Sequence, residues 1–513
     1  MGSQEGTDDH QRPIMRNAES GDGAGGGTAS TRLEPEAFGS FLAAFPAFGA
    51  TTRLDVLRRT DYSRLDRLGH VYLDYTGGGL FSSSQIARHQ QLLRESVLGN
   101  PHSGNPTSMA ASRLVDEARG AVLRFFNADP GEYGAIFVPN ATGALKLVGE
   151  SFPFGPGGRY LLTFDNHNSV NGIREFARRG GSSVTYVPVL SPQLRCNPGV
   201  VRDELSKISP GKPHLFAYPA QSNFSGVQHP LEWVSWAREA GWRVILDCAA
   251  FAPTNPLDLA AVKPDFVPLS FYKMFGYPTG IGALIYRHEA LRELRRPWFA
   301  GGTITVASVQ GEGWYHLAPG HAGFEDGTID YLGVPAVSIG LEHLASIGMD
   351  TIHTRVMALT GWLVGQLTAL THSNGRRLAQ VFGPTDLTQR GGTIAFYLLA
   401  PDGIPYDVRV LEAEAGRAGI SLRTGCFCNP GDGEVAHGIT RDDMARCFVG
   451  NTTPVTFEDC AETIRFSTGK TPNTIRASLG LASNFADAHA LIAFAERFRD
   501  VRADPVTGTP RIV

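Results

Sequence analysis

Short apolar runs alternate with amphipathic stretches from residue 71 onward, and this alternation is the main structural signal of the chain. The runs are rich in β-branched and aromatic residues, which favours strands, and they lie at 135–138, 160–163, 184–187, 215–218, 244–247, 266–269 and 283–286. Between them, apolar residues recur at helical spacing, as they do over 111–125. This order of elements predicts an α/β fold in which helices cover both faces of a mostly parallel sheet.

A second pattern begins near residue 332, where a long helical stretch leads into further alternating segments, including 392–399 and 463–466. These segments predict a smaller α+β domain with its own sheet. The expected organisation is a disordered tail over 1–34, an N-terminal segment over 35–70 that packs with the small domain, a large ligand-binding domain over 71–335, the small C-terminal domain over 336–500 and a loose tail over 501–513.

Composition and charge narrow the range of partners. The 513 residues are 42% hydrophobic and 19% charged, with a net charge of −4, so there is no basic field for nucleic acid or anionic lipid. No apolar stretch approaches the roughly 18 residues of a membrane span. Six cysteines at scattered spacings do not form a disulfide framework, and free thiols suit a reducing compartment. We therefore expect a cytoplasmic protein whose partners are small molecules or proteins.

Lys273 lies in an apolar, aromatic segment, 265–282, that breaks into glycines. The chain has six lysines, and the other five lie in polar or helical surroundings. Lys273 is therefore the one whose amine is expected to be desolvated. Desolvation lowers the pKa of an amine and leaves it nucleophilic, as a lysine that binds an aldehyde covalently must be. The alternative is a buried lysine whose charge reaches solvent at the end of its long side chain.

Asp247 ends a predicted strand 26 residues before Lys273. This ordered pair suits pyridoxal 5′-phosphate, because a carboxylate keeps the pyridine nitrogen protonated while the lysine holds the aldehyde. Taken alone, an Asp at a strand end is commonly a turn or a helix cap.

Two other strand ends suit the same cofactor. Residues 136–144 run from a strand into a helix through small residues that include Ala141 and Thr142, and a helix N-terminus favours a phosphate. His167 follows another strand and could stack on the cofactor ring and carry protons. The alternatives are an ordinary capped turn and a loop histidine with satisfied hydrogen bonds.

Cys428 lies among Gly, Asn and Pro residues, which indicates a mobile loop, and Arg423 nearby would favour its thiolate. Such a thiolate can take sulfur from a substrate. The alternatives are a redox pair, or a metal site formed by Cys426, Cys428, His437 and Cys447. The spacing fits zinc signatures poorly, so we expect no metal.

Arg476 lies within an apolar, strand-like run. A guanidinium in such a place needs an anion, and a substrate carboxylate held in its fork is one candidate. A structural ion pair is the other candidate.

These residues together resemble the class V, fold-type I pyridoxal-phosphate enzymes, and among them the cysteine desulfurase domain of molybdenum cofactor sulfurases. The resemblance runs from about residue 71 to 495. Its landmarks are 73–78, 99–103, 218–226, 266–282, 324–328 and 423–428.

The resemblance implies a role for each matching residue. For the cofactor these are Lys273 at the aldehyde, Asp247 at the pyridine nitrogen, His167 stacked on the ring, Ala141, Thr142 and Ser270 at the phosphate, and Asn223 near the phenolic oxygen. For the substrate they are Arg476 at the cysteine carboxylate with Arg423 beside it, and Cys428 as the nucleophile that becomes a persulfide. Gly327 and Thr328 match a segment that reaches the phosphate of a neighbouring subunit, which implies a homodimer with shared sites.

The implied activity is a cysteine desulfurase that takes sulfur from L-cysteine, releases alanine, and passes the sulfur to an acceptor protein or small molecule. Three residues depart from the family pattern and affect cofactor tuning: Ala250 in place of Gln, Tyr272 in place of His, and Asn140 in place of Gly. The alternatives are a class V aminotransferase, epimerase or lyase that forms no persulfide, and a non-catalytic binding protein.

Overall fold

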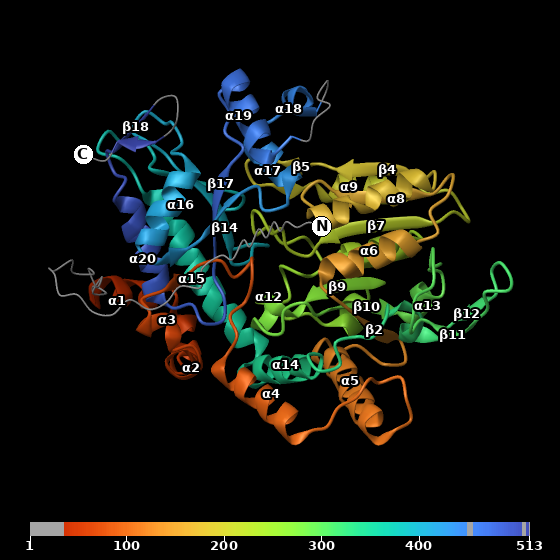
Figure 1. Ribbon diagram of the computed structural model, residues 1–513. Coiled ribbons are helices and arrows are strands. Elements are labelled where there is room, and N and C mark those ends of the chain that lie inside the picture. The colour runs from red at the N-terminus through yellow and green to blue at the C-terminus, as the bar shows by residue number, and fades with distance from the viewer. Residues whose placement is uncertain (1–34, 449–454, 505–508, 512–513) are drawn as a thin grey trace, which may run out of the picture.

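Seven strands form the central sheet of the larger domain, in the order β2-β10-β9-β8-β7-β3-β4 (Figure 1). This computed structural model describes residues 35–448, 455–504 and 509–511, so the tail expected over 1–34 lies outside the described residues. The strands are β2 Tyr133–Val138, β3 Arg159–Thr163, β4 Ser183–Val187, β7 His214–Pro219, β8 Arg243–Asp247, β9 Phe266–Ser270 and β10 Gly282–Arg287. Only β10 among them runs antiparallel to its neighbours, which confirms the prediction of a mostly parallel sheet.

Alternate residues along each strand enter two different cores. In β3, Tyr160 and Leu162 pack against α6 and α8, whereas Leu161 belongs to the core on the other face, with α5, α9, α10 and α14. This period of two is the geometry of a strand, and it buries both faces of the sheet. The helices of this domain are α4 Ser83–Glu95, α5 Pro106–Phe125, α6 Ala141–Ser151, α7 Asn168–Asn171, α8 Ile173–Arg179, α9 Pro198–Ser206, α10 Trp233–Glu239, α11 Leu259–Val262, α12 Phe271–Phe275, α13 His288–Leu291 and η2 Gly320–Phe324.

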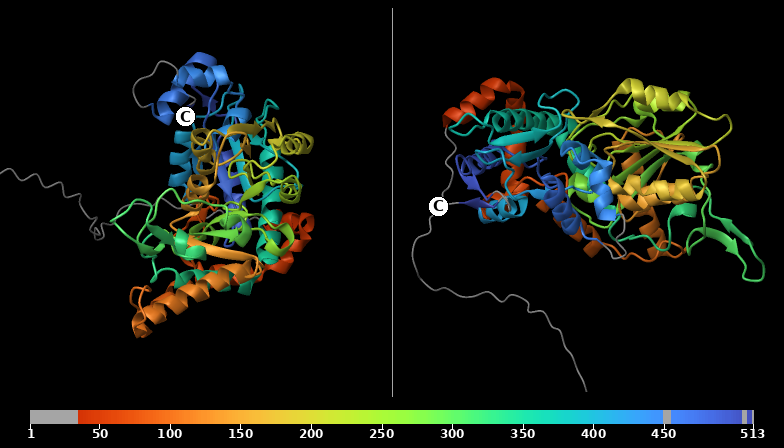
Figure 2. Two further views of the ribbon diagram at one scale, coloured as in Figure 1. Left: turned by 90° about the vertical axis from the view of Figure 1, so that its right-hand side faces the viewer. Right: turned by 90° about the horizontal axis from the view of Figure 1, so that it is seen from above.

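Two minor strand pairs accompany the large sheet. They are β5 Val189–Leu190 with β6 Arg195–Cys196, and β11 Ile304–Ala307 with β12 Tyr315–Leu317. Figure 2 shows the β11–β12 hairpin projecting from the large domain on the side away from the small one.

A four-stranded antiparallel sheet, in the order β13-β14-β17-β16, forms the smaller domain. Its strands are β13 Ala379–Phe382, β14 Thr393–Leu398, β16 Arg423–Gly425 and β17 Thr474–Ser478. The accompanying helices are α15 Met349–Ala369, α16 Val408–Arg417, α17 Pro430–Ala436, α18 Arg441–Phe448, α19 Phe457–Thr468 and α20 Phe485–Glu496. The preceding helix, α14 Pro335–Ile347, packs on α4 and α5 of the large domain. In addition, β1 Val71–Tyr72 pairs with β15 Ile420–Ser421, so the chain at 71–72 joins this domain.

The N-terminal helices α1 Pro35–Ala44, η1 Pro46–Thr51, α2 Arg53–Asp61 and α3 Arg64–Arg67 also lie on the small domain (Figure 1). Phe41 stacks on Phe485 of α20 with ring centroids 4.7 Å apart. The buried Arg58 forms an ion pair with Asp487 at 2.5 Å. Residues 35–70 are therefore fixed to the small domain by both apolar and charged contacts.

Two expectations for the C-terminal half are wrong. Residues 463–466 lie in helix α19 and not in a strand, because Thr456 and Asp459 form a capping box and Cys460, Ala461 and Ile464 share one buried helical face. Cys447 and Cys460 form a disulfide, so not all six cysteines are free thiols.

The tail expected over 501–513 contains a short antiparallel pair, β18 Arg502–Ala503 with β19 Pro510–Arg511. None of the described helices is both long and apolar enough to cross a bilayer.

Candidate active site

Lys273 and Asp247 come together at the carboxyl edge of the large sheet. Asp247 is the last residue of β8, and Lys273 lies in α12, which follows β9 directly. Burial raises the pKa of Asp247 and lowers that of Lys273, and each charge partly offsets the shift of the other. Asp247 and Lys273, which were paired from the sequence, therefore interact electrostatically.

The Lys273 amine is desolvated, although the residue as a whole keeps some exposed surface. Burial is the largest cause of its lowered pKa, and the charges of Arg476 and Arg423 act in the same direction. Within the described part of the chain, the amine makes no hydrogen bond or ion pair. A buried amine of this kind is suited to forming a covalent bond with an aldehyde.

The N-terminus of α6 gathers three predicted phosphate ligands. The backbone N–H of Ala141 donates to Ser270 Oγ at 2.9 Å, and the hydroxyls of Thr142 and Ser169 lie 2.8 Å apart. Asn140 caps the helix by accepting from Gly143 N–H at 3.0 Å. Hydroxyls and N–H groups at a helix N-terminus provide the donors that a phosphate needs.

His167 is held as a neutral imidazole. The Ser169 N–H donates to His167 Nδ1 at 3.1 Å, so the ring proton belongs on Nε2. Burial, followed by the charges of Lys273 and Arg476, lowers the pKa of His167 to about 4. A neutral ring beside these two cations can stack on a cofactor and accept a proton.

Cys428 is exposed at the end of a short loop between β16 and α17, and it faces the same site. Its charge acts on both Lys273 and Arg476. The loop is anchored, because Asn168 N–H donates to the carbonyl of Cys428 and Asn223 Nδ2 donates to that of Phe427, each at 2.7 Å. The mobility expected of this loop stays a prediction, and any movement of its backbone has to break these bonds.

Asn429 ties the thiol loop to the large domain. Its Nδ2 donates to the Asp165 carbonyl at 2.8 Å and to Asn223 Oδ1 at 3.1 Å, and its Oδ1 accepts from Asp432 N–H at 3.1 Å. The side chain is fully buried. The sequence showed it only as part of an Asn-Pro turn, and its role was missed.

Arg476 and Arg423 share the carboxylate of Asp74. Arg476 Nη2 donates to Asp74 Oδ1 at 3.0 Å, and Arg423 Nη2 donates to Asp74 Oδ2 at 2.7 Å. Arg476 is buried and also donates to the Asn223 carbonyl at 2.9 Å, yet its Nε has no partner in the described structure. The structural ion pair considered for Arg476 therefore exists, and one N–H is left for a further acceptor.

Gly327 and Thr328 make their hydrogen bonds outside this cluster. Gly327 N–H donates to the Gly301 carbonyl at 2.8 Å, and Thr328 is exposed with its hydroxyl 3.2 Å from Asn100 Nδ2. No contact with Lys273 or Asp247 links them to the site within the part of the chain described.

The alternative metal set around Cys428 is not assembled. Cys447 is bonded to Cys460, and both ring nitrogens of His437 are engaged, by Tyr397 at 2.6 Å and Thr474 at 2.7 Å. Burial also lowers the pKa of His437 to about 3.

Comparisons with known proteins agree with this arrangement. The family model for aminotransferase class-V matches residues 71–491, and the chain belongs to that family. Molybdenum cofactor sulfurase of Solanum lycopersicum is 35% identical over 475 residues, covering 86% of this chain and 57% of the relative. The human protein of the same name is 34% identical over 463 residues, covering 85% and 50%. The chain thus spans little more than half the length of these relatives.

Solved structures share the fold. A cysteine desulfurase from Thermococcus onnurineus superposes with a TM-score of 0.69 at 20% identity, covering 86% of this chain and 97% of that one. The cysteine desulfurase CsdA from Escherichia coli gives 0.66 at 20% identity, covering 87% and 98%. These likenesses confirm the predicted fold-type I architecture.

The family implies pyridoxal 5′-phosphate, and the residues present fit it. The unpaired Lys273 amine suits the aldehyde, and the donors at the start of α6 suit the phosphate. Among the described residues, the Asp247 carboxylate accepts one hydrogen bond, from Ala249 N–H at 3.0 Å, which leaves it able to accept another from a pyridinium.

Proposed function

We propose that this chain is a cysteine desulfurase that transfers the sulfur of L-cysteine to Cys428 and releases alanine. One observation carries the proposal: an exposed thiol is anchored against a site whose amine, Lys273, is buried. An aminotransferase or epimerase needs no thiol at this place. The names of the relatives, molybdenum cofactor sulfurase, and of the structures, cysteine desulfurase, support the same assignment.

In the proposed arrangement, Lys273 binds the cofactor aldehyde, Asp247 accepts from the pyridine nitrogen, and Asn223 lies near the phenolic oxygen. His167 stacks on the ring, and Ala141, Thr142 and Ser270 hold the phosphate. When bound, pyridoxal 5′-phosphate supplies an electron sink for the carbanion at the substrate Cα.

The protein supplies the remaining chemistry. Arg476 uses its unpaired Nε to bind the substrate carboxylate, with Arg423 held beside it by the shared Asp74. Lys273, freed by the substrate amine, takes the Cα proton, as its lowered pKa permits. The Cys428 thiolate then attacks the substrate sulfur: an S–S bond forms, the C–S bond breaks, and protons returned to carbon give alanine. L-Cysteine and a thiol thus yield alanine and a persulfide.

The test compares two neighbouring thiols. Wild-type protein, Cys428→Ser and Cys426→Ser are loaded with cofactor and given L-cysteine, and both alanine and the mass of the 428 peptide are measured. We expect one added sulfur atom on Cys428 in the wild type and in Cys426→Ser, and loss of both products in Cys428→Ser. Alanine formation that is unchanged in Cys428→Ser would favour a lyase or another class V reaction without a persulfide.

A second variant tests the alternative that the chain is a non-catalytic binding protein. Lys273→Ala is expected to abolish alanine formation and the absorption of lysine-bound cofactor. If the wild type shows no such absorption after incubation with pyridoxal 5′-phosphate, the enzyme assignment fails.

Assembly, acceptor and location complete the proposal. We propose a homodimer in which Gly327 and Thr328 reach the partner's cofactor phosphate, and an acceptor that is a protein or a small molecule. The cytoplasmic location follows from composition, and the Cys447–Cys460 disulfide weighs against it. Light scattering checks the dimer, and cell fractionation checks the location.

A further inference from the structure

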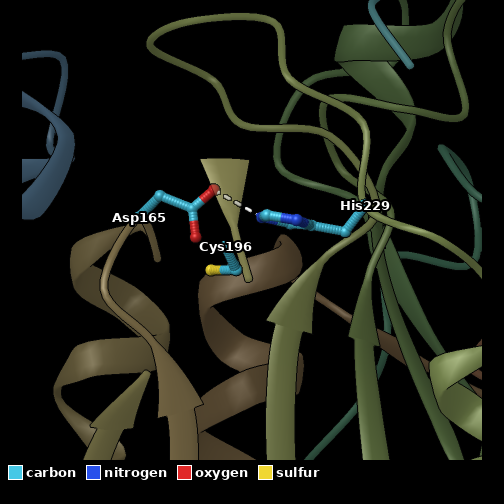
Figure 3. A group of neighbouring side chains, drawn as sticks. All are labelled: Asp165, Cys196 and His229. Atoms are coloured by element: carbon cyan, nitrogen blue, oxygen red, sulfur yellow. Dashed lines mark hydrogen bonds and ion pairs between the residues drawn. The ribbon is translucent and has the colours of Figure 1, made fainter. Parts of the chain in front are cut away.

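Three side chains converge behind the proposed site without a part in its chemistry: Asp165, Cys196 and His229 (Figure 3). Asp165 follows β3, Cys196 lies in β6, and His229 lies in the turn after β7. Their donor atoms all lie within 4.8 Å of one another. The residues are 0%, 6% and 4% exposed, so the cluster is sealed from solvent.

The hydrogen bonds of this cluster leave two buried oxygens unexplained. His229 Nε2 and Asp165 Oδ2 lie 2.7 Å apart, which satisfies one carboxylate oxygen. Asp165 Oδ1 has no partner in the described structure, and in Figure 3 it lies on the side of the Cys196 sulfur. Oδ1 of the neighbouring Asp432 also lacks a partner, although Asp432 Oδ2 accepts from Ser222 at 2.5 Å. Buried acceptors without a donor are rare and commonly mark an ion or a water.

We infer that Asp165, Cys196 and His229 bind a divalent cation of the zinc type. Carboxylate oxygen, thiolate and imidazole are the ligands that zinc takes in proteins. The fourth position would go to a water or to Asp432 Oδ1. This assignment departs from the sequence-based expectation of no metal, which considered only the set Cys426, Cys428, His437 and Cys447.

The charge of such a site balances. A 2+ ion with one thiolate, one carboxylate and a neutral imidazole has no net charge, so burial does not oppose it. Binding displaces the thiol proton and replaces the hydrogen bond between His229 Nε2 and Asp165 Oδ2.

The geometry requires a small adjustment. Two ligands of a tetrahedral zinc at about 2.1 Å lie about 3.4 Å apart, whereas His229 Nε2 and Asp165 Oδ2 are 2.7 Å apart. If both atoms bind the ion, the pair therefore opens by about 0.7 Å.

The ion would be structural. Asp165 stands two positions before His167, and His229 stands six after Asn223, so one ion would join two segments that border the proposed cofactor site. It would do so independently of the reaction at Cys428.

The experiment uses full-length Cys426→Ser/Cys428→Ser protein, which removes the two loop thiols as competing ligands. The protein is dialysed against a chelator, given Zn²⁺, dialysed again, and examined by elemental analysis and zinc X-ray absorption. We expect about one zinc per chain with one sulfur at about 2.3 Å and nitrogen or oxygen at about 2.0–2.1 Å. No retained zinc, or zinc without a sulfur ligand, overturns the inference.

Matched variants assign the sulfur. Adding Cys196→Ser to that protein is expected to remove the sulfur signal and weaken zinc binding at least about tenfold, a 1.4 kcal/mol change. Cys248→Ser, which alters another buried free thiol, is expected to leave both unchanged. If Cys248→Ser removes the sulfur signal while Cys196→Ser does not, the ion is bound elsewhere. If Cys196→Ser does not fold, Asp165→Asn replaces it, and unchanged zinc affinity there overturns the assignment.

Discussion

Replacing Asn429 with Ala is expected to uncouple the thiol loop from the rest of the site. The change deletes a helix N-cap, which costs about 1 kcal/mol. It also leaves the Asp165 carbonyl and Asn223 Oδ1 without a donor that now lies at 2.8 and 3.1 Å. A buried acceptor left unpaired costs about 1–3 kcal/mol. With partial relaxation, we expect a loss of about 3 kcal/mol in the free energy of unfolding.

Asn197→Ala is the matched control. Asn197 also caps a helix, accepting from Gly199 N–H at 2.8 Å, but it is exposed and its side chain makes no further hydrogen bond in the described part of the chain. We expect about 1 kcal/mol there. Urea unfolding of both variants measures the difference.

An activity assay separates the effect of Asn429→Ala on the position of the thiol from its effect on stability. With cofactor and L-cysteine, Asn429→Ala is expected to form the Cys428 persulfide about tenfold to a hundredfold more slowly, because a reacting atom displaced by about 1 Å costs that much. Absorption of lysine-bound cofactor should be unchanged, since Lys273 lies on another element. Equal losses in Asn429→Ala and Asn197→Ala, in stability and in persulfide rate, would refute the reasoning.

Three further predictions concern Asp74, His167 and Ser270. Asp74→Asn removes the charge between two arginines, one of them buried, and should lower the free energy of unfolding by about 3 kcal/mol. Glu342→Gln affects an exposed ion pair and should lower it by about 1 kcal/mol or less. Urea unfolding compares the two variants. Because the folded pKa of His167 is about 4 and its ordinary value 6.5, stability should fall as pH drops through that window, by about 2 kcal/mol at pH 5, and His167→Gln should lack this loss. Ser270→Ala removes a phosphate ligand and the acceptor for Ala141 N–H, so the dissociation constant for pyridoxal 5′-phosphate, followed by absorption, should rise about tenfold; an unchanged constant contradicts the assignment.

The large sheet was predictable because burial on both faces produces a simple sequence pattern, a short run of apolar residues. Each of the seven apolar runs became a strand. Six of these strands are buried along nearly their whole length, as expected where both faces of a sheet are covered, whereas the edge strand β4 is only partly buried. The prediction of a strand over 463–466 failed for the opposite reason. These residues are a fragment of a half-buried helix, and over four residues an apolar-polar alternation is not distinguishable from a strand. The Thr456–Asp459 capping box was the signal that could have corrected the prediction.

The site was predictable where its reactive side chains lie at the ends of strands. Asp247 and Lys273 follow adjacent strands of one sheet, so the parallel topology alone brings them together. Asp74 could not be found in this way, because it meets Arg423 across 349 residues of sequence and through a loop. Likewise, nothing local indicates that Cys447 faces Cys460, since their proximity depends on how α18 packs on α19.

The placement of charges explains why a single site combines a buried amine with an exposed thiol. Lys273 and Arg476 are desolvated and have lowered pKa values, and Asp247 and Asp74 lie among them as counter-charges. A low-dielectric environment of this kind strengthens interactions with an anionic substrate and favours proton transfer at its Cα. Under the proposed function, sulfur delivery has the opposite requirement, because the acceptor has to reach the sulfur atom from outside. Cys428 meets both requirements, since its carbonyl is bonded to Asn168 beside His167 while its side chain is exposed. Burying this thiol would protect the persulfide but prevent its transfer, so exposure at this position is what a sulfur donor needs.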